Sequence, residues 1–156
     1  MKNEKGFSLV ELLVVVIIIA IIAAIAIPNL LASRRAANEA SAINSMRTYH
    51  SAQSTYQATL GGGTNYALDP TQLTGLVDSL LDDAAPAKSG YNYTLIGAAA
   101  SGTAASIYCA DADPQSTTTG TNFYGVESGN GGVVVRNAAT LGCAAGALAV
   151  AGTPIQ

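Results

Sequence analysis

The stretch that decides the fold is residues 5–28, which read KGFSLVELLVVVIIIAIIAAIAIP. Between Glu11 and Pro28 no side chain is polar. Residues 7–27, at 1.5 Å per residue, form a helix of about 31 Å, which is long enough to cross the hydrocarbon core of a bilayer. Glu11 does not fit a plain membrane anchor, because a charged group at mid-membrane costs about 2.5–3.5 kcal/mol on insertion scales. The sequence therefore predicts a membrane-compatible helix whose carboxylate needs a partner.

The apolar run is one part of a longer helical pattern. Residues 1–6 form a short polar leader whose two lysines favour the cytoplasmic side. Pro28 lacks a backbone donor and predicts a helix break. The pattern resumes and continues through residues 30–60 without Gly or Pro, until three consecutive glycines stop it. We expect a single long helix over residues 7–60, kinked at the proline.

The second half of this helix is amphipathic. Two rows of residues recur at steps of three and four and predict a helix: Ala36, Ala40, Ile43, Met46 and His50, and Tyr49, Ala52, Tyr56 and Leu60. On the polar face, Glu39 follows Arg35 by four residues, a spacing that predicts an ion pair along the helix.

Beyond the helix the pattern changes to short extended segments and turns. A short helical segment is expected over residues 69–81, and residues 111–121, DADPQSTTTGT, read as a polar loop. The tail from Ala138 is not assigned. The expected strands are residues 91–96, 106–109, 122–126 and 133–135. The predicted fold class is α+β, with a long N-terminal helix, transmembrane in its first half, packed on a small antiparallel sheet.

Composition excludes several classes of function. Charged residues make up 11% of the 156 residues, below the ~25% of soluble domains, and the net charge is −3 with no basic face for nucleic acid. No nucleophile–base set, phosphate-binding loop or metal triad is present, so we expect neither an enzyme nor a cofactor. The single histidine, His50, is expected to pack in the head or to be solvated.

Two cysteines, Cys109 and Cys143, lie in the last third of the chain. They share no short metal-binding spacing, and the single histidine is distant, which argues against zinc. A disulfide is the better interpretation if this part lies outside the cytoplasm. It would close a loop of about 34 residues and contribute roughly 3–4 kcal/mol. The carboxylates of residues 82, 83, 111 and 113 suit calcium by type, but solvated loop positions explain them more simply.

Residues 6–11, GFSLVE, resemble the signature of type IV prepilins. In that family a short charged leader ends in Gly, a Phe follows, and a Glu stands four positions later inside an apolar run. Gly6, Phe7 and Glu11 match, and so does Pro28. The resemblance covers residues 1–60 and, beyond them, extends only to the general plan of the head.

The resemblance implies how the chain is processed. A prepilin peptidase would cut between Gly6 and Phe7 and remove the leader, residues 1–6. The new α-amine of Phe7 would be N-methylated and stay charged, and would meet Glu11 of a neighbouring copy. Residues 7–60 would then be the long helix, with residues 7–27 in the membrane or the filament core. Residues 61–156 would form the globular pilin head, braced by the cysteine pair.

The function implied is that of a structural subunit of a type IV pilus, used for adhesion, twitching motility or DNA uptake. The chain would be a single-pass inner-membrane protein before assembly and part of an extracellular pilus afterwards. Its partners would be identical copies, the peptidase, an assembly platform with ATPases, and a secretin. Three alternatives stay open: a pseudopilin of a type II secretion system or a minor pilin, a membrane-tethered binding protein that never polymerises, and an ordinary signal peptide or plain anchor.

Overall fold

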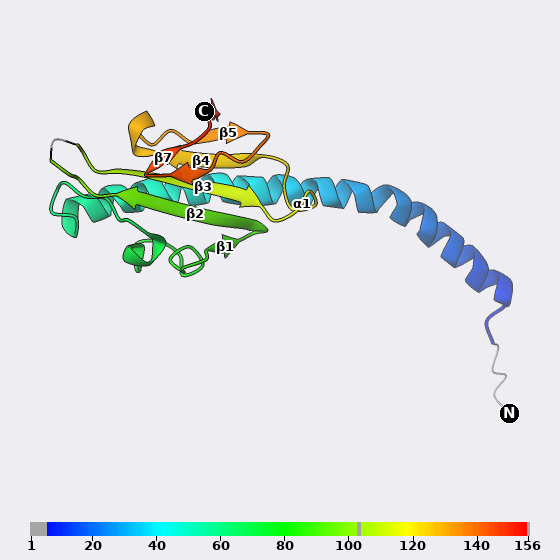
Figure 1. Ribbon diagram of the computed structural model, residues 1–156. Helices are drawn as coiled ribbons and strands as arrows, with labels where there is room; N and C mark the ends of the chain where they lie inside the picture. The colour runs from blue at the N-terminus through cyan, green and yellow to red at the C-terminus, as the bar shows by residue number, and fades with distance from the viewer. Residues whose placement is uncertain (1–5, 103, 156) are drawn as a thin grey trace. The chain divides into compact units, whose positions relative to one another are not determined.

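A computed structural model describes residues 6–102 and 104–155 and divides the chain into two compact units, residues 1–34 and 35–156. The longest element is helix α1, Leu9–Thr59, which contains Pro28 (Figure 1). The proline does not end the helix, although it removes one backbone hydrogen-bond donor. The predicted leader is residues 1–6, of which residues 1–5 lie outside the described residues.

Glycines end α1, as the sequence predicts. The N–H groups of Leu60 and Gly61 donate to the carbonyl of Tyr56 at 2.9 and 2.7 Å, and Gly63 donates to Gln57 at 2.8 Å. Gly62 has φ 62°, in the left-handed region that side-chain-bearing residues rarely adopt. The three glycines thus satisfy the last carbonyls of the helix and turn the chain away from its axis.

The head unit contains an antiparallel sheet that packs against residues 35–59 of α1. The sheet order is β1-β2-β3-β4-β5-β8, and a separate two-stranded sheet pairs β6 with β7. The long central strands β2 and β3 pair from Tyr91↔Pro114 to Ala98↔Ile107. The strands are β1 Ala87–Lys88, β2 Tyr91–Ala98, β3 Ile107–Pro114, β4 Phe123–Glu127, β5 Val135–Asn137, β6 Cys143–Ala144, β7 Ala147–Leu148 and β8 Thr153–Pro154. The predicted α+β class, a long N-terminal helix on an antiparallel sheet, is confirmed.

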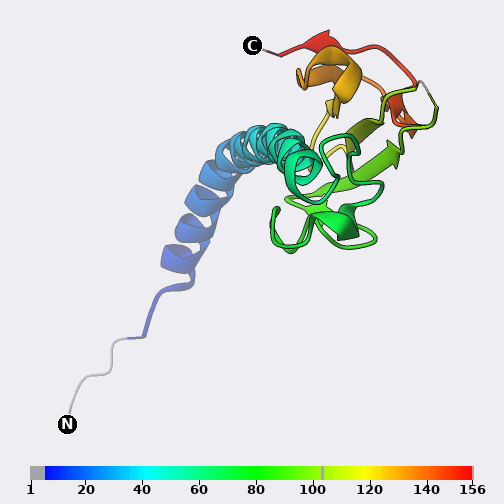
Figure 2. The same cartoon turned by 90° about the vertical axis from the view of Figure 1, so that its left-hand side faces the viewer.

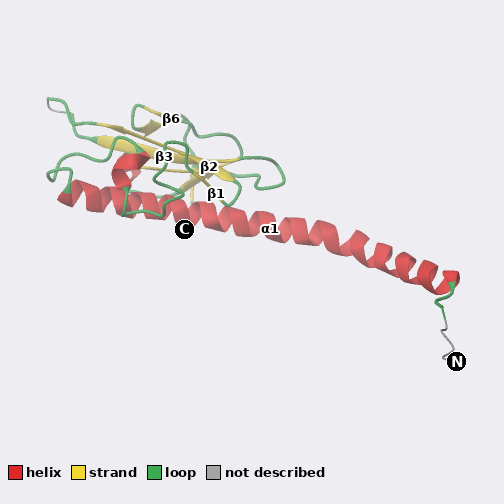
Figure 3. Cartoon of the chain, turned by 90° about the horizontal axis from the view of Figure 1, so that it is seen from below, coloured by secondary structure: helices red, strands yellow, loops and turns green. Residues whose placement is uncertain are grey.

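The core lies between the helix and one face of the sheet (Figure 2). Ala42, Met46 and Tyr49 are fully buried on the helix side. Alternate residues of β3 point toward them, because side chains alternate across a strand: Tyr108, Ala110 and Ala112 join the same cluster. The intervening residues of β3 face the opposite side, where β6 lies (Figure 3) and where Cys109 is bonded to Cys143. The head therefore has three layers: helix, main sheet and the short β6–β7 hairpin.

Two sequence predictions about the connections are wrong in part. The helical segment expected over residues 69–81 is only one 3₁₀ turn, η1, Pro70–Leu73. Asp69 caps its start by accepting the Thr71 N–H at 2.9 Å, and Gly75, at φ 81°, then turns the chain. The glycine ends the segment well before the position that the sequence predicts.

The strand boundaries also differ from the prediction. Residues 111–114 belong to β3 and not to a polar loop, because they pair with residues 91–94 of β2. The run of valines from residue 133 enters a strand only at Val135. In both cases the end of the strand is set by pairing with a segment distant in the sequence. The polarity of the residues along the chain does not indicate where the strand ends.

Candidate functional site

The first candidate site is the N-terminal end of α1. Ser8 precedes the helix, and its hydroxyl accepts the N–H of Val10 at 3.3 Å. In return, Oε2 of Glu11 accepts the backbone N–H of Ser8 at 2.9 Å. This reciprocal pair is a capping box, which satisfies two of the free N–H groups at a helix start. The negative charge of Glu11 also lies at the positive end of the helix dipole.

The side chains that follow this end of the helix are exposed. Within residues 7–31 the large apolar side chains are 40–86% exposed, from Leu31 to Phe7. Among the described residues, α1 is the one helix long and apolar enough to cross a membrane, and none of its most apolar window is buried. Water is a poor environment for such a surface, at roughly 25 cal/mol per Å² of apolar area. The apolar side chains of the first half of α1 are therefore not buried by residues of their own unit, and burying them requires other molecules.

The predicted site residues of the first unit lie at known places. Gly6 and Phe7 immediately precede the capping box, and Phe7 and Glu11 line one shallow hollow together with Val10, Val14 and Val15. Pro28 lies inside α1. The cleavage, methylation, assembly and helix-break roles assigned to Gly6, Phe7, Glu11 and Pro28 stay predictions.

Ser8 is a functional candidate that sequence reasoning missed. In this structure Phe7 is joined to Gly6 and has no free amine, and the Glu11 carboxylate accepts the backbone N–H of Ser8. The pairing of Glu11 with the Phe7 amine of a neighbouring copy stays a prediction. The signal was present as S-x-x-E directly before an apolar run, which is the pattern of a capping box. Glu11 therefore has a local role in its own chain in addition to any role between chains.

A second carboxylate, Glu39, joins the helix to the sheet in the head unit. Its Oε1 accepts the N–H and the hydroxyl of Thr121 at 3.0 and 3.1 Å. Its Oε2 accepts the Asn122 amide at 3.0 Å and the Tyr124 hydroxyl at 3.2 Å. Partial burial raises the pKa of Glu39, but these four hydrogen bonds outweigh it and lower the pKa below its usual value. The expected ion pair with Arg35 is not formed in the described residues.

The tyrosines of the head are packing residues with satisfied hydroxyl groups. Tyr49 donates to the Leu81 carbonyl at 2.7 Å, Tyr91 to the Asn122 carbonyl at 2.9 Å, and Tyr93 to the Ser45 hydroxyl at 3.3 Å. Burial raises the pKa of all three hydroxyl groups, so they stay protonated in any ordinary buffer. His50 lies 2.5 Å from the hydroxyl of Tyr108, which places it in the head packing.

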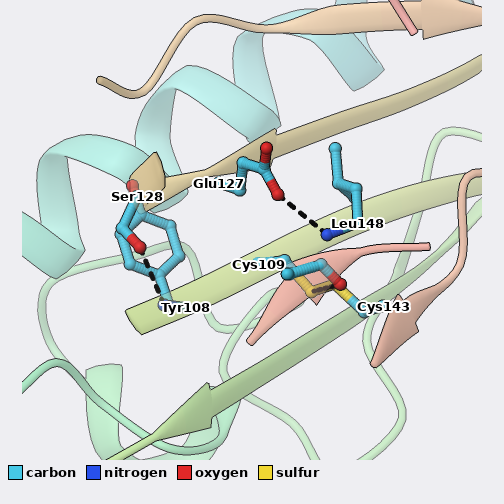
Figure 4. The surroundings of a disulfide bond; sticks show 7 residues. Tyr108, Cys109, Glu127, Ser128, Cys143 and Leu148 are labelled. Atoms are coloured by element: carbon cyan, nitrogen blue, oxygen red, sulfur yellow. Dashed lines mark hydrogen bonds between the residues drawn. A yellow bond between two sulfur atoms is a disulfide. The ribbon is translucent and has the colours of Figure 1, made fainter. Parts of the chain in front are cut away.

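The cysteine pair forms the disulfide Cys109–Cys143, with a Cα–Cα distance of 5.8 Å (Figure 4). It links β3 to the β6–β7 hairpin. Near it, the Leu148 N–H donates to Oε2 of Glu127 at 2.8 Å. Among the described residues no three His, Cys, Asp or Glu side chains are grouped as a metal site would require.

Comparisons with known proteins agree with the geometry of the first unit. Residues 1–27 match the family model of the prokaryotic N-terminal methylation motif. The N-terminal segment of the chain is therefore similar to that motif. The chain is also 54% identical over 39 residues to the type IV wide pilus major component PilA4 of Thermus thermophilus. These findings confirm the predicted resemblance to type IV pilins.

That likeness to PilA4 covers only a part of each chain. The matched segment covers 25% of this chain and spans about 30% of the length of PilA4. No solved structure matches the chain significantly. The head is therefore interpreted from its own contacts.

Proposed function

We propose that this protein is a structural subunit of a type IV pilus. Residues 1–6 are a leader that a prepilin peptidase removes between Gly6 and Phe7, whose amine is then methylated. Residues 7–60 are the polymerising helix, and residues 61–156 are the head. The subunit waits in the inner membrane and is then extracted into an extracellular filament.

The observation that carries this proposal is an exposed apolar helix whose first turn contains a carboxylate, Glu11, that caps the start of the helix. The bilayer covers residues 7–27 before assembly, and the helices of other copies cover them afterwards. Both environments remove the same apolar area from water, so transfer from one to the other costs little hydrophobic free energy. This exchange explains why the helix is retained and not removed as a signal peptide would be.

Glu11 supplies the register of assembly. The capping box offers the carboxylate one backbone N–H, so a carboxylate oxygen stays available to accept from another donor. The Phe7 α-amine of an arriving copy is positively charged and lies just before the first turn of that copy's helix. An ion pair between them, in a dry filament core, is favoured at one axial position and penalised at the others.

The assembly partners follow from the proposed family role. They are the prepilin peptidase, an inner-membrane platform with its ATPases, and a secretin for passage through the outer membrane. The filament then serves adhesion, twitching motility or DNA uptake. The heads, each fastened by a disulfide, form its outer surface.

The test is to shear intact cells and to ask where the mature chain is found. We expect long fibres in the sheared fraction that contain this chain as the main protein and begin at a methylated Phe7 by mass spectrometry. Recovery only as short periplasmic fibres, or as traces among another pilin, would assign it to the pseudopilins or minor pilins. A monomer clipped beyond Ala26 would overturn the proposal.

A further inference from the structure

Residues 140–150 form a strap over the face of the sheet that looks away from the helix. The strap closes on itself: β6 pairs with β7, the Ala149 N–H donates to Gly142 at 2.8 Å, and Val150 donates to Leu141 at 3.1 Å. Its strands belong to a separate sheet from β3 and β4 beneath it. The strap is therefore a closed hairpin laid on the sheet and not a further strand of it.

Few links hold the strap to the sheet. One is covalent, the disulfide between Cys109 of β3 and Cys143 of the strap (Figure 4). Three are hydrogen bonds to carboxylates: the Thr140 hydroxyl to Asp113 at 3.1 Å, the Leu148 N–H to Glu127 at 2.8 Å, and the Cys143 backbone N–H to Asp111. The apolar anchor is Leu141, which is fully buried.

Gly125 of β4 makes the close approach of the strap possible. A Cβ at this position would lie 2.9 Å from side-chain carbons of Leu141 and of Leu148. A larger residue here would displace the ends of these leucine side chains from their present positions on the sheet.

Beneath the strap lies Asp111, which is only 4% exposed. It is on the same face of β3 as Cys109 and Asp113, and its partners across the sheet are Thr94 of β2 and Gly125 of β4. The charged groups on this face, Asp113 and Glu127, are both acids. The strap itself holds no titratable side chain apart from the disulfide-bonded cysteine. A buried carboxylate thus faces like charges and no cation.

This environment opposes ionisation of Asp111. Burial, and then the charge of Asp113, raise its pKa from 3.8 to about 6, against hydrogen bonds from the Thr94 side chain and the Cys143 backbone that favour the charged form. Opening the strap would return the carboxylate to water. Because the closed form binds the proton more tightly, strap closure is favoured at acid pH and disfavoured as pH rises through about 6.

We propose that the Cys109–Cys143 disulfide holds the strap closed over an ionised Asp111, and that without this disulfide the strap opens when Asp111 is charged. The strap is then a conformational device with two inputs, thiol state and pH. This role is separate from filament assembly and does not depend on it.

The test is amide hydrogen exchange on the purified full chain, read as protection factors that correct for the intrinsic effect of pH. With the disulfide intact, we expect the amides of residues 148–150 to be equally protected at pH 5 and pH 7.5. After reduction, protection should be higher at pH 5 and fall by about tenfold at pH 7.5. The paired substitution Cys109→Ala and Cys143→Ala should behave like the reduced chain.

Adding Asp111→Asn to the reduced chain should restore protection at pH 7.5, because the amide cannot ionise. Asp83→Asn, at an exposed loop acid, is the matched control and should restore nothing. Amides of β2 report whether the head stays folded, and the chemically reduced chain replaces the double alanine variant if that variant does not fold. Protection that is independent of pH in the reduced chain, or that Asp111→Asn does not restore, would overturn the proposal.

Discussion

The two halves of α1 have the same secondary structure but opposite surroundings. In residues 9–34 large aliphatic side chains stay exposed, with Ile22 at 60%, whereas in residues 35–59 Met46 and Tyr49 are fully buried against the sheet. Each half carries one notable acid. Glu11 caps the helix through a bond within its own turn, while Glu39 reaches residues more than 80 positions away. The first half is thus built for other molecules, and the second for its own head.

The largest expected effect comes from blocking the maturation of the first half. Gly6→Leu should leave an uncut precursor and abolish pili, because a bulky side chain occupies the position at which the peptidase is proposed to cut. A gel shift and the intact mass measure it. Gly129→Leu is the matched control, since a Cβ there has no neighbour closer than 4.0 Å. A fully processed Gly6→Leu chain would disprove the cleavage assignment.

The next prediction distinguishes the role of Glu11 from that of Glu39. Glu11→Ala should reduce sheared pili at least tenfold while leaving cleavage and the stability of the head unchanged, because its contacts lie within the first helical turn. Pilus yield and the cleaved fraction are measured together. Normal assembly of Glu11→Ala would remove the proposed ion pair with the neighbouring amine.

Glu39→Gln should show the opposite behaviour, with normal cleavage and a less stable head. A glutamine cannot accept all four hydrogen bonds, and loss of charged bonds at a partly exposed site is worth about 1–2 kcal/mol. Because the pKa of Glu39 is lowered, its stabilisation is present at neutral pH and is lost as pH falls through that pKa, so the difference from the parent chain should shrink toward pH 3. Urea unfolding of the full chain, followed by tyrosine fluorescence, measures it at each pH. A difference that does not change with pH would contradict the assignment to the carboxylate charge.

The smallest expected effect is that of Ser8→Ala. This change removes the acceptor of the Val10 N–H but keeps the backbone N–H that Glu11 accepts. The first turn should lose about 1 kcal/mol, as for other N-cap substitutions. Reduced protection of the Val10 amide in detergent micelles would show it, with pilus yield falling less than in Glu11→Ala. If Ser8→Ala equalled Glu11→Ala in yield, the hydroxyl and not the carboxylate would control assembly.

Local patterns predicted the parts of the molecule that depend on neighbours along the chain. The span of the helix, its stop at Gly61–Gly63 and the acid at Glu11 all follow from spacing and composition. The S-x-x-E capping box was equally local and was overlooked. By contrast, Asp111–Pro114 looked like a loop because the residues are polar, and only pairing with β2 makes them a strand.

The sequence by itself determined the long helix, its apolar first half and the prepilin-like start, because periodicity, glycine stops and unbroken hydrophobicity act over a few residues. Tertiary structure alone decided that Glu39 binds Thr121 and not Arg35, that Cys143 lies over β3, and that the strap buries Asp111. These contacts join positions far apart in the chain. The energies of these contacts depend on which surfaces pack together when the sheet forms. The spacing of residues along the chain does not indicate which surfaces those are.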